Sequence, residues 1–347
     1  MKVHNTITLP QGVRDILPDE ARKIGVVESA ILDVFGKYGF SKVITPLLEY
    51  VDVLSLGMGE NLKERVLKFI DPSTGRVVAI RPDITPQIAR VVATRMRDVP
   101  LPLKLCYNEN VLRYQEPRDG RSREVLQIGA EYISGKPSAE ADAEMIVMAI
   151  EAFSGLGLKD FKIDIGDVGF LRGVLDRLNV TDQERAQIKG ALAIKDTSGL
   201  GIMLDALSAP LPVGDRELLL NLTTFYGEEE VIAKARSFSN DPAAIESLDN
   251  LQRIVDIIND RGFRDLVTID LGEVRGFDYY TGIIFEGFAS GIGKPILGGG
   301  RYDTLLARYG YPVAARASPS TSRTSSPRSK GSRPTWATGR EWRVGGG

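Results

Sequence analysis

Side chains that could do chemistry gather in a few short segments of the 347-residue chain. Residues 12–18, 80–85, 112–131 and 274–281 are rich in carboxylates, arginines and tyrosines, and residues 298–303 run Gly-Gly-Gly-Arg-Tyr-Asp. A carboxylate can hold an amine or an imidazole, an arginine can hold a carboxylate or a phosphate, and a tyrosine hydroxyl can orient a ligand. As a set, the segments predict a polar pocket on an antiparallel sheet.

Residues 124–133 give the clearest geometric argument, because they are predicted to form a strand. Side chains alternate along a strand, so Gln127, Gly129 and Glu131 share one face. Since glycine has no side chain, it leaves room between the amide and the carboxylate. We therefore expect a small ligand to fit between Gln127 and Glu131.

Each candidate side chain also has an ordinary structural interpretation. Arg113 could pair with a neighbouring carboxylate, and Glu131 could be a solvated or salt-bridged strand residue. Tyr279 and Tyr280 could be packing aromatics. The prediction of a pocket therefore depends on the whole set of residues and not on any one of them.

The counts of histidine and cysteine restrict the chemistry. The chain has one histidine, His4, and one cysteine, Cys106, so neither an internal disulfide nor a Cys/His zinc site can be assembled. A Ser-His-Asp or Cys-His mechanism would have to depend on His4. The glycine-rich run 287–294 has the wrong spacing for a phosphate-binding loop, and the chain has no Gly-x-Gly-x-x-Gly motif. We therefore predict no catalytic residues, no metal and no cofactor.

The charge is distributed unevenly along the chain. Residues 313–347 carry seven Lys or Arg and one Glu, whereas residues 1–312 carry 37 Lys or Arg and 45 Asp or Glu. An acidic body argues against broad nucleic-acid binding, which needs a basic surface. The sequence shows neither the apolar run of a secretory signal nor a membrane-spanning stretch, so we expect a cytoplasmic protein with no membrane partner.

The pattern of apolar residues predicts an α+β fold in which an antiparallel sheet, flanked by helices, is interrupted by a helical insertion. Strands are expected at 103–108, 111–114 and 124–133, and again at 266–270 and 282–288. The predicted division is a first core part at 1–160, a helical insertion at 161–262, a second core part at 263–312 and a tail at 313–347.

The predicted tail differs in composition from the rest of the chain. Residues 313–347 contain no Leu, Ile, Met or Phe and are rich in Ser, Thr and Arg. Such a segment cannot bury enough apolar surface to offset its ordering entropy, so we expect it to be disordered. The change is abrupt after residues 311–315, which suggests translation in a shifted reading frame; a genuine basic arm is the alternative.

These segments together resemble the catalytic core of a class II aminoacyl-tRNA synthetase of the histidyl type. Residues 39–46 with Glu49 resemble the first motif of that class, which lies at a dimer interface. Residues 112–131 resemble the second motif, and 275–280, Arg-Gly-Phe-Asp-Tyr-Tyr, resemble the signature of histidine recognition. The resemblance covers residues 8–312 and implies the synthetase fold.

Several departures from the synthetase pattern point to a related family. Gln115 stands where the second motif has a glutamate, no third motif is recognisable, and the anticodon-binding domain is missing, so tRNA is not an expected partner. With residues 81–90, the chain resembles the regulatory subunits of ATP phosphoribosyltransferase. That family implies a dimer within a hetero-octamer, a short-form catalytic subunit as partner, and histidine as a feedback effector in the first step of histidine biosynthesis.

The resemblance also implies a histidine pocket made of eight side chains: Asp83, Thr85, Arg113, Gln127, Glu131, Arg275, Tyr279 and Tyr280. The carboxylate of Glu131 would accept a hydrogen bond from the imidazole N–H, with a hydroxyl of Tyr279 or Tyr280 at the other ring nitrogen. The side chains at 83, 85 and 127 would hold the α-ammonium group, and the two arginines would face the carboxylate.

Two other functions remain open at this point. A truncated synthetase-like enzyme would still form an aminoacyl-adenylate, and histidine-dependent ATP–pyrophosphate exchange would reveal it. A pure assembly scaffold would keep only a vestigial pocket and would bind no histidine in calorimetry. We favour the non-catalytic regulatory subunit, because Gln115 and the missing third motif count against adenylation.

Overall fold

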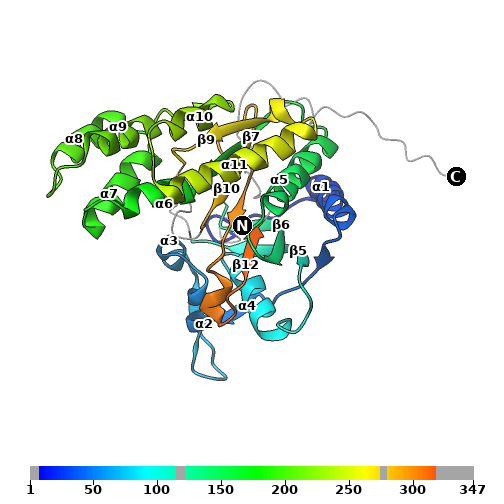
Figure 1. Ribbon diagram of the computed structural model, residues 1–347. Helices are drawn as coiled ribbons and strands as arrows, with labels where there is room; N and C mark the ends of the chain where they lie inside the picture. Colours follow the sequence, from blue (N-terminus) through cyan, green and yellow to red (C-terminus); the bar gives the residue numbers. More distant parts are fainter. Residues whose placement is uncertain (1–7, 115–121, 274–279, 318–347) are drawn as a thin grey trace, which may run out of the picture.

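The computed structural model describes residues 8–114, 122–273 and 280–317, which form a mixed α+β fold around one large sheet (Figure 1). The helices are α1 (Pro18–Lys37), α2 (Val51–Leu56), α3 (Glu60–Lys63), α4 (Thr85–Arg95), α5 (Ala139–Gly155), α6 (Val168–Asp176), α7 (Asp182–Ala193), α8 (Thr197–Asp205), α9 (Val213–Leu222), α10 (Glu230–Arg236) and α11 (Pro242–Asp260), with the 3-10 turns η2 (Arg264–Leu266) and η3 (Leu306–Tyr309). The strands are β1 (Ser41–Lys42), β2 (Leu48–Tyr50), β3 (Lys68–Ile70), β4 (Val77–Ile80), β5 (Leu103–Leu112), β6 (Glu124–Gly135), β7 (Phe161–Asp167), β8 (Tyr226–Gly227), β9 (Val267–Asp270), β10 (Ile283–Ala289), β11 (Leu297–Arg301) and β12 (Ala314–Ala317). Among these helices, none is long and apolar enough to cross a membrane.

The main sheet is mostly antiparallel, as the fold class predicts. Within the described ranges it has nine strands in the order β1-β5-β6-β12-β11-β10-β7-β9-β8. The pairs β1–β5 and β7–β9 are parallel, and the remaining neighbours are antiparallel. A second, three-stranded sheet has the order β2-β4-β3. The predicted fold class is therefore confirmed.

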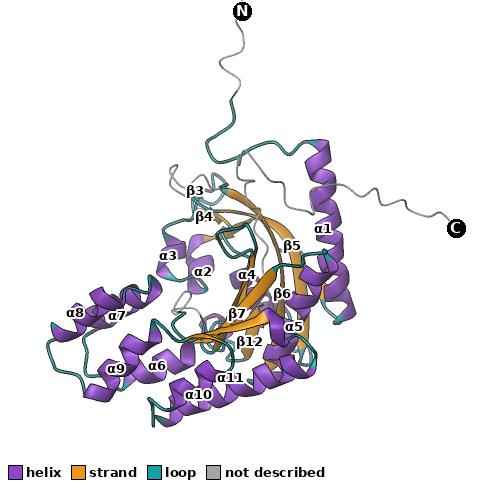
Figure 2. Ribbon diagram, turned by 90° about the horizontal axis from the view of Figure 1, so that it is seen from above, coloured by secondary structure: helices purple, strands orange, loops and turns teal. Residues whose placement is uncertain are grey.

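One face of the main sheet is covered by α5, with α1 and α11 packed beside it (Figure 1 and Figure 2). Ser138 caps α5 by accepting a hydrogen bond from the N–H of Ala141 at 3.3 Å. Most of the side chains on α5 are buried, because the helix lies between the sheet and its two neighbours. This face holds the larger hydrophobic core.

The opposite face of the sheet is covered by α4 and η3. Apolar side chains of these two elements form a second core cluster with β5, β6 and β12. Gln127 and Glu131 lie in β6 at alternate positions with Ile128 and Ala130, which belong to the α5 core. The two polar side chains therefore point toward α4.

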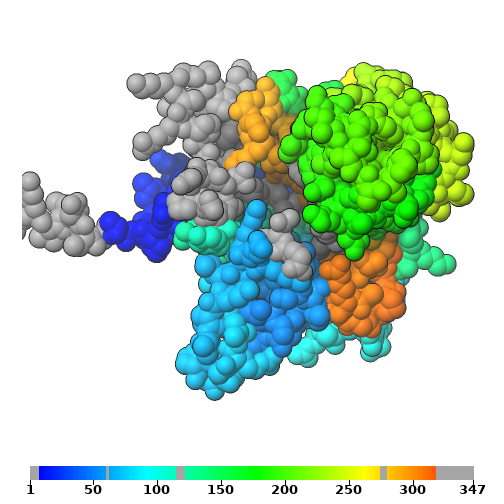
Figure 3. Space-filling view, turned by 90° about the vertical axis from the view of Figure 1, so that its left-hand side faces the viewer, coloured from blue at the N-terminus to red at the C-terminus, as the bar shows by residue number. Residues whose placement is uncertain are grey.

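The helices α6 to α11 lie between β7 and β9 in the sequence, where a helical insertion is predicted, and the short strand β8 between α9 and α10 joins the edge of the main sheet. In Figure 3 much of the insertion appears as a rounded green lobe beside the blue β2–β4 region and the orange η3 region. The predicted boundary at 161 differs from the structure, because residues 161–167 form β7 between β10 and β9. The alternation of apolar Phe161, Ile163 and Ile165 explains this strand.

The start of the predicted tail also differs from the structure. Residues Ala314–Ala317 form β12, which lies between β6 and β11, and all four residues are buried. The backbones of β11 and β12 approach closely, which requires glycine at position 299: a Cβ on Gly299 would lie 2.6 Å from the carbonyl oxygen of Ala317. The sheet thus continues past residue 312, and the rest of the predicted tail, 318–347, lies outside the described residues.

Candidate functional site

The candidate site lies on the α4 face of the sheet, where β5 and β6 run side by side. Its floor is Gln127, Gly129 and Glu131 of β6, with Tyr107 of β5 paired opposite Gly129. The turn between β4 and α4 forms one wall and carries Asp83. Strand pairing and this turn therefore bring together side chains that are far apart in the sequence.

Glu131 is the centre of the site, and its side chain is fully buried. Its Oε1 accepts hydrogen bonds from Thr85 Oγ1 at 2.6 Å and from the Tyr107 hydroxyl at 3.3 Å. Its Oε2 accepts a hydrogen bond from the Tyr302 hydroxyl. Burial raises the pKa of Glu131 to about 8, although the three hydroxyl donors favour the ionised form and oppose this shift.

Gln127 links the floor of the site to the turn before α4. Its Nε2 donates to Asp83 Oδ1 at 2.7 Å and contacts the Tyr107 hydroxyl at 3.5 Å. Its Oε1 is buried and has no hydrogen-bond partner among the described residues. A buried acceptor without a donor is costly, so this oxygen is suited to receive an N–H from a ligand.

Arg81 fixes the turn that presents Asp83 and Thr85. Its guanidinium is 3% exposed and donates to the carbonyl oxygens of Thr45 and Asn110, each at 2.8 Å. It also forms an ion pair with Glu109 at 2.9 Å. These bonds tie the turn to β5, so the turn and the floor of the site are held as one unit.

Arg113 and Tyr280 lie at the border of the site. Arg113 Nε donates to the carbonyl oxygen of Pro82 at 2.7 Å, which places this cation beside the turn. The ring of Tyr280 packs on Gly300, where a Cβ would lie 2.8 Å from its Cδ1. Burial, together with the charges of Asp83 and Glu131, raises the pKa of Tyr280 above its usual value.

The structure therefore brings together five of the eight predicted pocket residues, with Tyr280 beside them. The five are Asp83, Thr85, Arg113, Gln127 and Glu131. Arg275 and Tyr279, the two other predicted residues, lie outside the described part of the chain.

Two tyrosines of the site have no role in the sequence prediction. Tyr107 and Tyr302 are each 1% exposed and both donate to Glu131. Tyr302 could have been found from its place in the Arg-Tyr-Asp motif at the end of the glycine-rich stretch. No sequence pattern pointed to Tyr107 as a site residue. It lies in the long strand β5 at a position where an apolar, buried side chain is expected, so it reads as a packing residue.

Tyr107 also changes the expectation of free space over Gly129. A Cβ on Gly129 would lie 2.4 Å from the Cζ and hydroxyl oxygen of Tyr107. The missing side chain therefore makes room for the phenol ring and not directly for a ligand. Glycine at this position lets Tyr107 reach Glu131.

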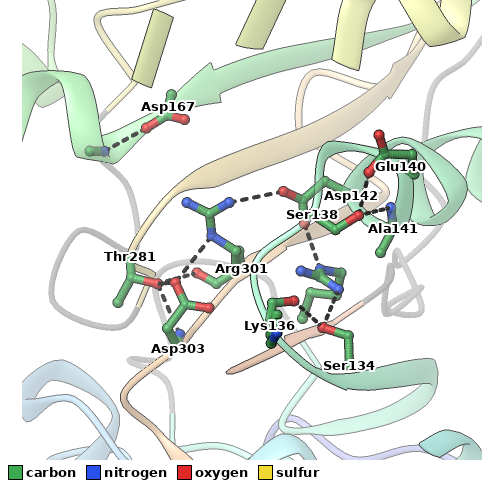
Figure 4. Close-up of polar contacts among 12 residues, drawn as sticks. Ser134, Lys136, Ser138, Glu140, Ala141, Asp142, Asp167, Thr281, Arg301 and Asp303 are labelled. Atoms are coloured by element: carbon green, nitrogen blue, oxygen red, sulfur yellow. Dashed lines mark hydrogen bonds and ion pairs between the residues drawn. The ribbon is translucent and has the colours of Figure 1, made fainter. Parts of the chain in front are cut away.

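Behind the site, on the α5 face, a buried network of charges fixes β11 and β12 (Figure 4). Asp142 of α5 forms ion pairs with Arg301 at 3.1 Å and with Arg316 at 2.5 Å. Arg301 also pairs with Asp303 at 3.1 Å, and Asp303 accepts from the hydroxyl of Thr281 at 2.7 Å. The network holds Thr281, which follows Tyr280, and also Arg301 and Asp303, which flank Tyr302.

The site has the chemistry of a binding pocket for a small, partly cationic molecule. It offers a buried carboxyl, a second carboxylate at Asp83, hydroxyls and an amide oxygen, with one arginine at its edge. Among the described residues, no group of three or more His, Cys, Asp or Glu side chains could hold a metal ion.

Comparisons with known proteins identify the family of this chain. The family model for histidyl-tRNA synthetase matches residues 12–319. The ATP phosphoribosyltransferase regulatory subunit of Geobacter sulfurreducens is 46% identical over 307 residues, which cover 88% of this chain and 69% of that protein. The corresponding protein of Geobacter metallireducens is 47% identical over 309 residues, covering 88% and 70%.

A solved structure supports the same family assignment. An ATP phosphoribosyltransferase regulatory subunit/histidyl-tRNA synthetase from Bacillus halodurans superposes with a TM-score of 0.83 at 29% identity, covering 91% of this chain and 81% of that one. The synthetase-like sheet and the sequence identity thus lead to one family. The chain belongs to the ATP phosphoribosyltransferase regulatory subunits, which are built on the fold of histidyl-tRNA synthetase.

Proposed function

We propose that this chain acts as the regulatory subunit of ATP phosphoribosyltransferase in histidine biosynthesis and is not itself a catalyst. It would assemble with the short-form catalytic subunit, activate it and transmit feedback by histidine. The observation that carries the proposal is the buried carboxyl of Glu131 beneath three hydroxyl donors, in a chain whose relatives are named as regulatory subunits.

Histidine fits the charges and hydrogen-bonding groups of the site. The imidazole N–H would donate to Glu131, and the α-ammonium group would be held by Asp83, Thr85 and the unpartnered Oε1 of Gln127. Arg113, at the edge of the site, would face the ligand carboxylate. We assign Arg275 and either Tyr279 or Tyr280 to the same pocket on the resemblance of 275–280 to the histidine signature.

An exposed apolar surface supports self-association of the chain into the dimer of a hetero-octamer. Phe69 is paired with Val78 and Leu48 with Ile80, so Phe69 and Leu48 share one face of the β2-β4-β3 sheet. They are 42% and 44% exposed, and Ile44, just before β2, is 74% exposed. Contiguous apolar surface of this kind is typical of interfaces between protein chains.

Calorimetry with histidine tests the pocket directly. We expect Glu131→Ala to weaken histidine binding about ten- to a hundredfold, because a charge-assisted hydrogen bond contributes about 1.5–3 kcal/mol. Glu124→Ala is the matched control, since Glu124 starts the same strand and pairs only at the surface with Asn110. Equal affinity of Glu131→Ala and the unaltered chain would rule out the site.

Two further measurements separate the regulatory function from its alternatives. The chain should co-purify with a short-form catalytic subunit and raise its activity, and histidine should lower that activity. Histidine-dependent ATP–pyrophosphate exchange should be absent. Robust exchange would instead identify an adenylate-forming enzyme, and a chain that binds the catalytic subunit but no histidine would be a scaffold.

A further inference from the structure

The 44–49 segment, where the chain enters the β2-β4-β3 sheet, exposes apolar side chains and buries polar ones. Its three exposed apolar side chains are Ile44 at 74%, Leu47 at 50% and Leu48 at 44%. Thr45 is only 4% exposed, and the side chain of Glu49 is 8% exposed. This is the reverse of the usual arrangement in a folded chain. Inward polar contacts must therefore hold the segment in this orientation.

Gln87 of α4 makes these inward contacts through its side-chain amide, and the residue is fully buried. Its Nε2 donates to the carbonyl oxygen of Pro46 at 2.8 Å and to Oε2 of Glu49 at 2.7 Å. Its Oε1 accepts a hydrogen bond from Oγ1 of Thr45 at 2.8 Å. The amide thus spends both of its hydrogens and its oxygen on one short segment. A single side chain of α4 therefore holds the segment at three points.

Two arginines reinforce the same orientation. Arg81 donates through Nη1 to the carbonyl oxygen of Thr45 at 2.8 Å, and its N–H donates to the carbonyl oxygen of Leu47 at 3.1 Å. Arg90 of α4 forms an ion pair with Glu49. By contrast, the hydrophobic cluster beneath the small sheet has only four buried members among the described residues. Polar contacts with α4 and the turn before it therefore do much to fix the segment.

We propose that Gln87 is a positioning residue for self-association, because it holds the 44–49 segment so that Ile44, Leu47 and Leu48 face a second copy of this chain. Leu48 also lies on the exposed face of the β2-β4-β3 sheet, so the segment continues that face. A two-fold interface pairs a surface with itself, so an apolar strip of this kind is covered when two copies meet. Gln87 is buried within the chain and does not itself touch the second copy. The inference rests on the proposed dimer and deepens it.

Gln87→Glu tests this role by changing one group of the amide. The new carboxylate cannot donate to Pro46, and it faces the carboxylate of Glu49 across what is now a 2.7 Å hydrogen bond. We expect the dimer dissociation constant, measured by sedimentation equilibrium at neutral pH, to rise about ten- to a hundredfold.

Acid should reverse the effect of Gln87→Glu. Two carboxylates that share one site hold a proton between them at a raised pKa, and the protonated form can again donate a hydrogen bond. The other charged or titratable groups beside Glu49 are Arg90 and Tyr309, and these residue types do not titrate in weak acid. At about pH 5, most of the loss should therefore be recovered relative to the unaltered chain at the same pH. General damage to the fold would not be repaired in this way.

Gln252→Glu is the matched control. Gln252 lies in α11, and its Nε2 donates to Oε1 of Glu229 at 2.5 Å, so the same substitution again sets a carboxylate against a glutamate. This contact lies within the helical insertion and not beside the small sheet. The variant should keep the dimer dissociation constant within about twofold of the unaltered chain, because distant sites act independently.

Glu49→Gln is a milder variant that decides the question if Gln87→Glu does not fold. It keeps an oxygen that can accept from Gln87 but loses the ion pair with Arg90, so the dimer dissociation constant should rise about three- to tenfold.

Three outcomes would contradict these expectations. Normal dimer dissociation constants in folded Gln87→Glu and in Glu49→Gln would overturn the inference and leave the proposed regulatory function intact. A raised constant that acid does not restore in Gln87→Glu would also overturn it. An unaltered chain that stays monomeric would refute the proposed dimer itself, and the inference with it.

Discussion

The side chain of Glu131 combines full burial with three hydroxyl donors, and none of its hydrogen-bond partners in the described part of the chain is a cation. With a pKa of about 8, it holds a proton at neutral pH in the ligand-free chain. A buried carboxylate becomes stable when a cation arrives beside it. We therefore expect the bound ring of histidine to be an imidazolium that shares the pocket with ionised Glu131.

This protonation state predicts how histidine affinity depends on pH. Below a pH of about 6.5, where free imidazole is protonated, both free partners carry a proton and binding must release one. Above the Glu131 pKa of about 8, neither carries a proton and binding must take one up. Affinity should therefore be highest between these values and fall by up to about tenfold per pH unit outside them.

Calorimetry in buffers of different ionisation enthalpy measures this proton exchange. Glu131→Gln cannot ionise, so it should lose the decline in affinity above the Glu131 pKa of about 8. An affinity that keeps rising above that pH in the unaltered chain would mean that neutral imidazole binds, contrary to our expectation.

At the level of elements, β12 depends on one buried side chain. Arg316 is 1% exposed, and it bonds to Asp142 of α5 and, through Nη1, to Ser134 of β6 at 2.9 Å. The other side chains of β12 are alanines, which bury little apolar surface. The position of this strand is therefore set mainly by backbone pairing and by the arginine.

Arg316→Met should destabilise the fold by about 3–5 kcal/mol, because it removes one partner of a buried ion pair and leaves Asp142 incompletely compensated. Chemical denaturation measures this free energy of unfolding. The control is Arg76→Met, which breaks the exposed pair with Asp52 and should cost about 0–1 kcal/mol. Similar losses for the two variants would argue against a structural role for Arg316.

Strands β5, β6 and β12 show which features of the fold and site could be predicted from sequence patterns and which could not. Alternation in β6 placed Gln127 and Glu131 on one face, because a strand has a fixed period. The same rule could not identify Tyr107 as the residue opposite Gly129, since register depends on pairing between strands. Strand β12 was hidden because its alanines carry no apolar pattern, and its partner strands become visible only in the folded sheet.

At the scale of the whole molecule, the exposed face of the β2-β4-β3 sheet predicts a dimer. Phe69→Asp places a charge on that face and should convert the dimer to a monomer in sedimentation velocity, because an unpaired charge is costly in an apolar interface. Ile202→Asp, on the 73% exposed Ile202 of α8, should leave the dimer intact. A dimer that survived Phe69→Asp would place the interface elsewhere.

The position of β12 has a consequence for how the chain is made. Strands β1, β5 and β6 lie on one side of it and β11, β10, β7, β9 and β8 on the other, so the two parts of the main sheet meet only through residues 314–317. During synthesis, the first part can pair and pack on α1 long before those residues exist. The two parts can be joined by strand pairing only after residue 317 has left the ribosome, and until then the edges of β6 and β11 stay open to pairing with other chains.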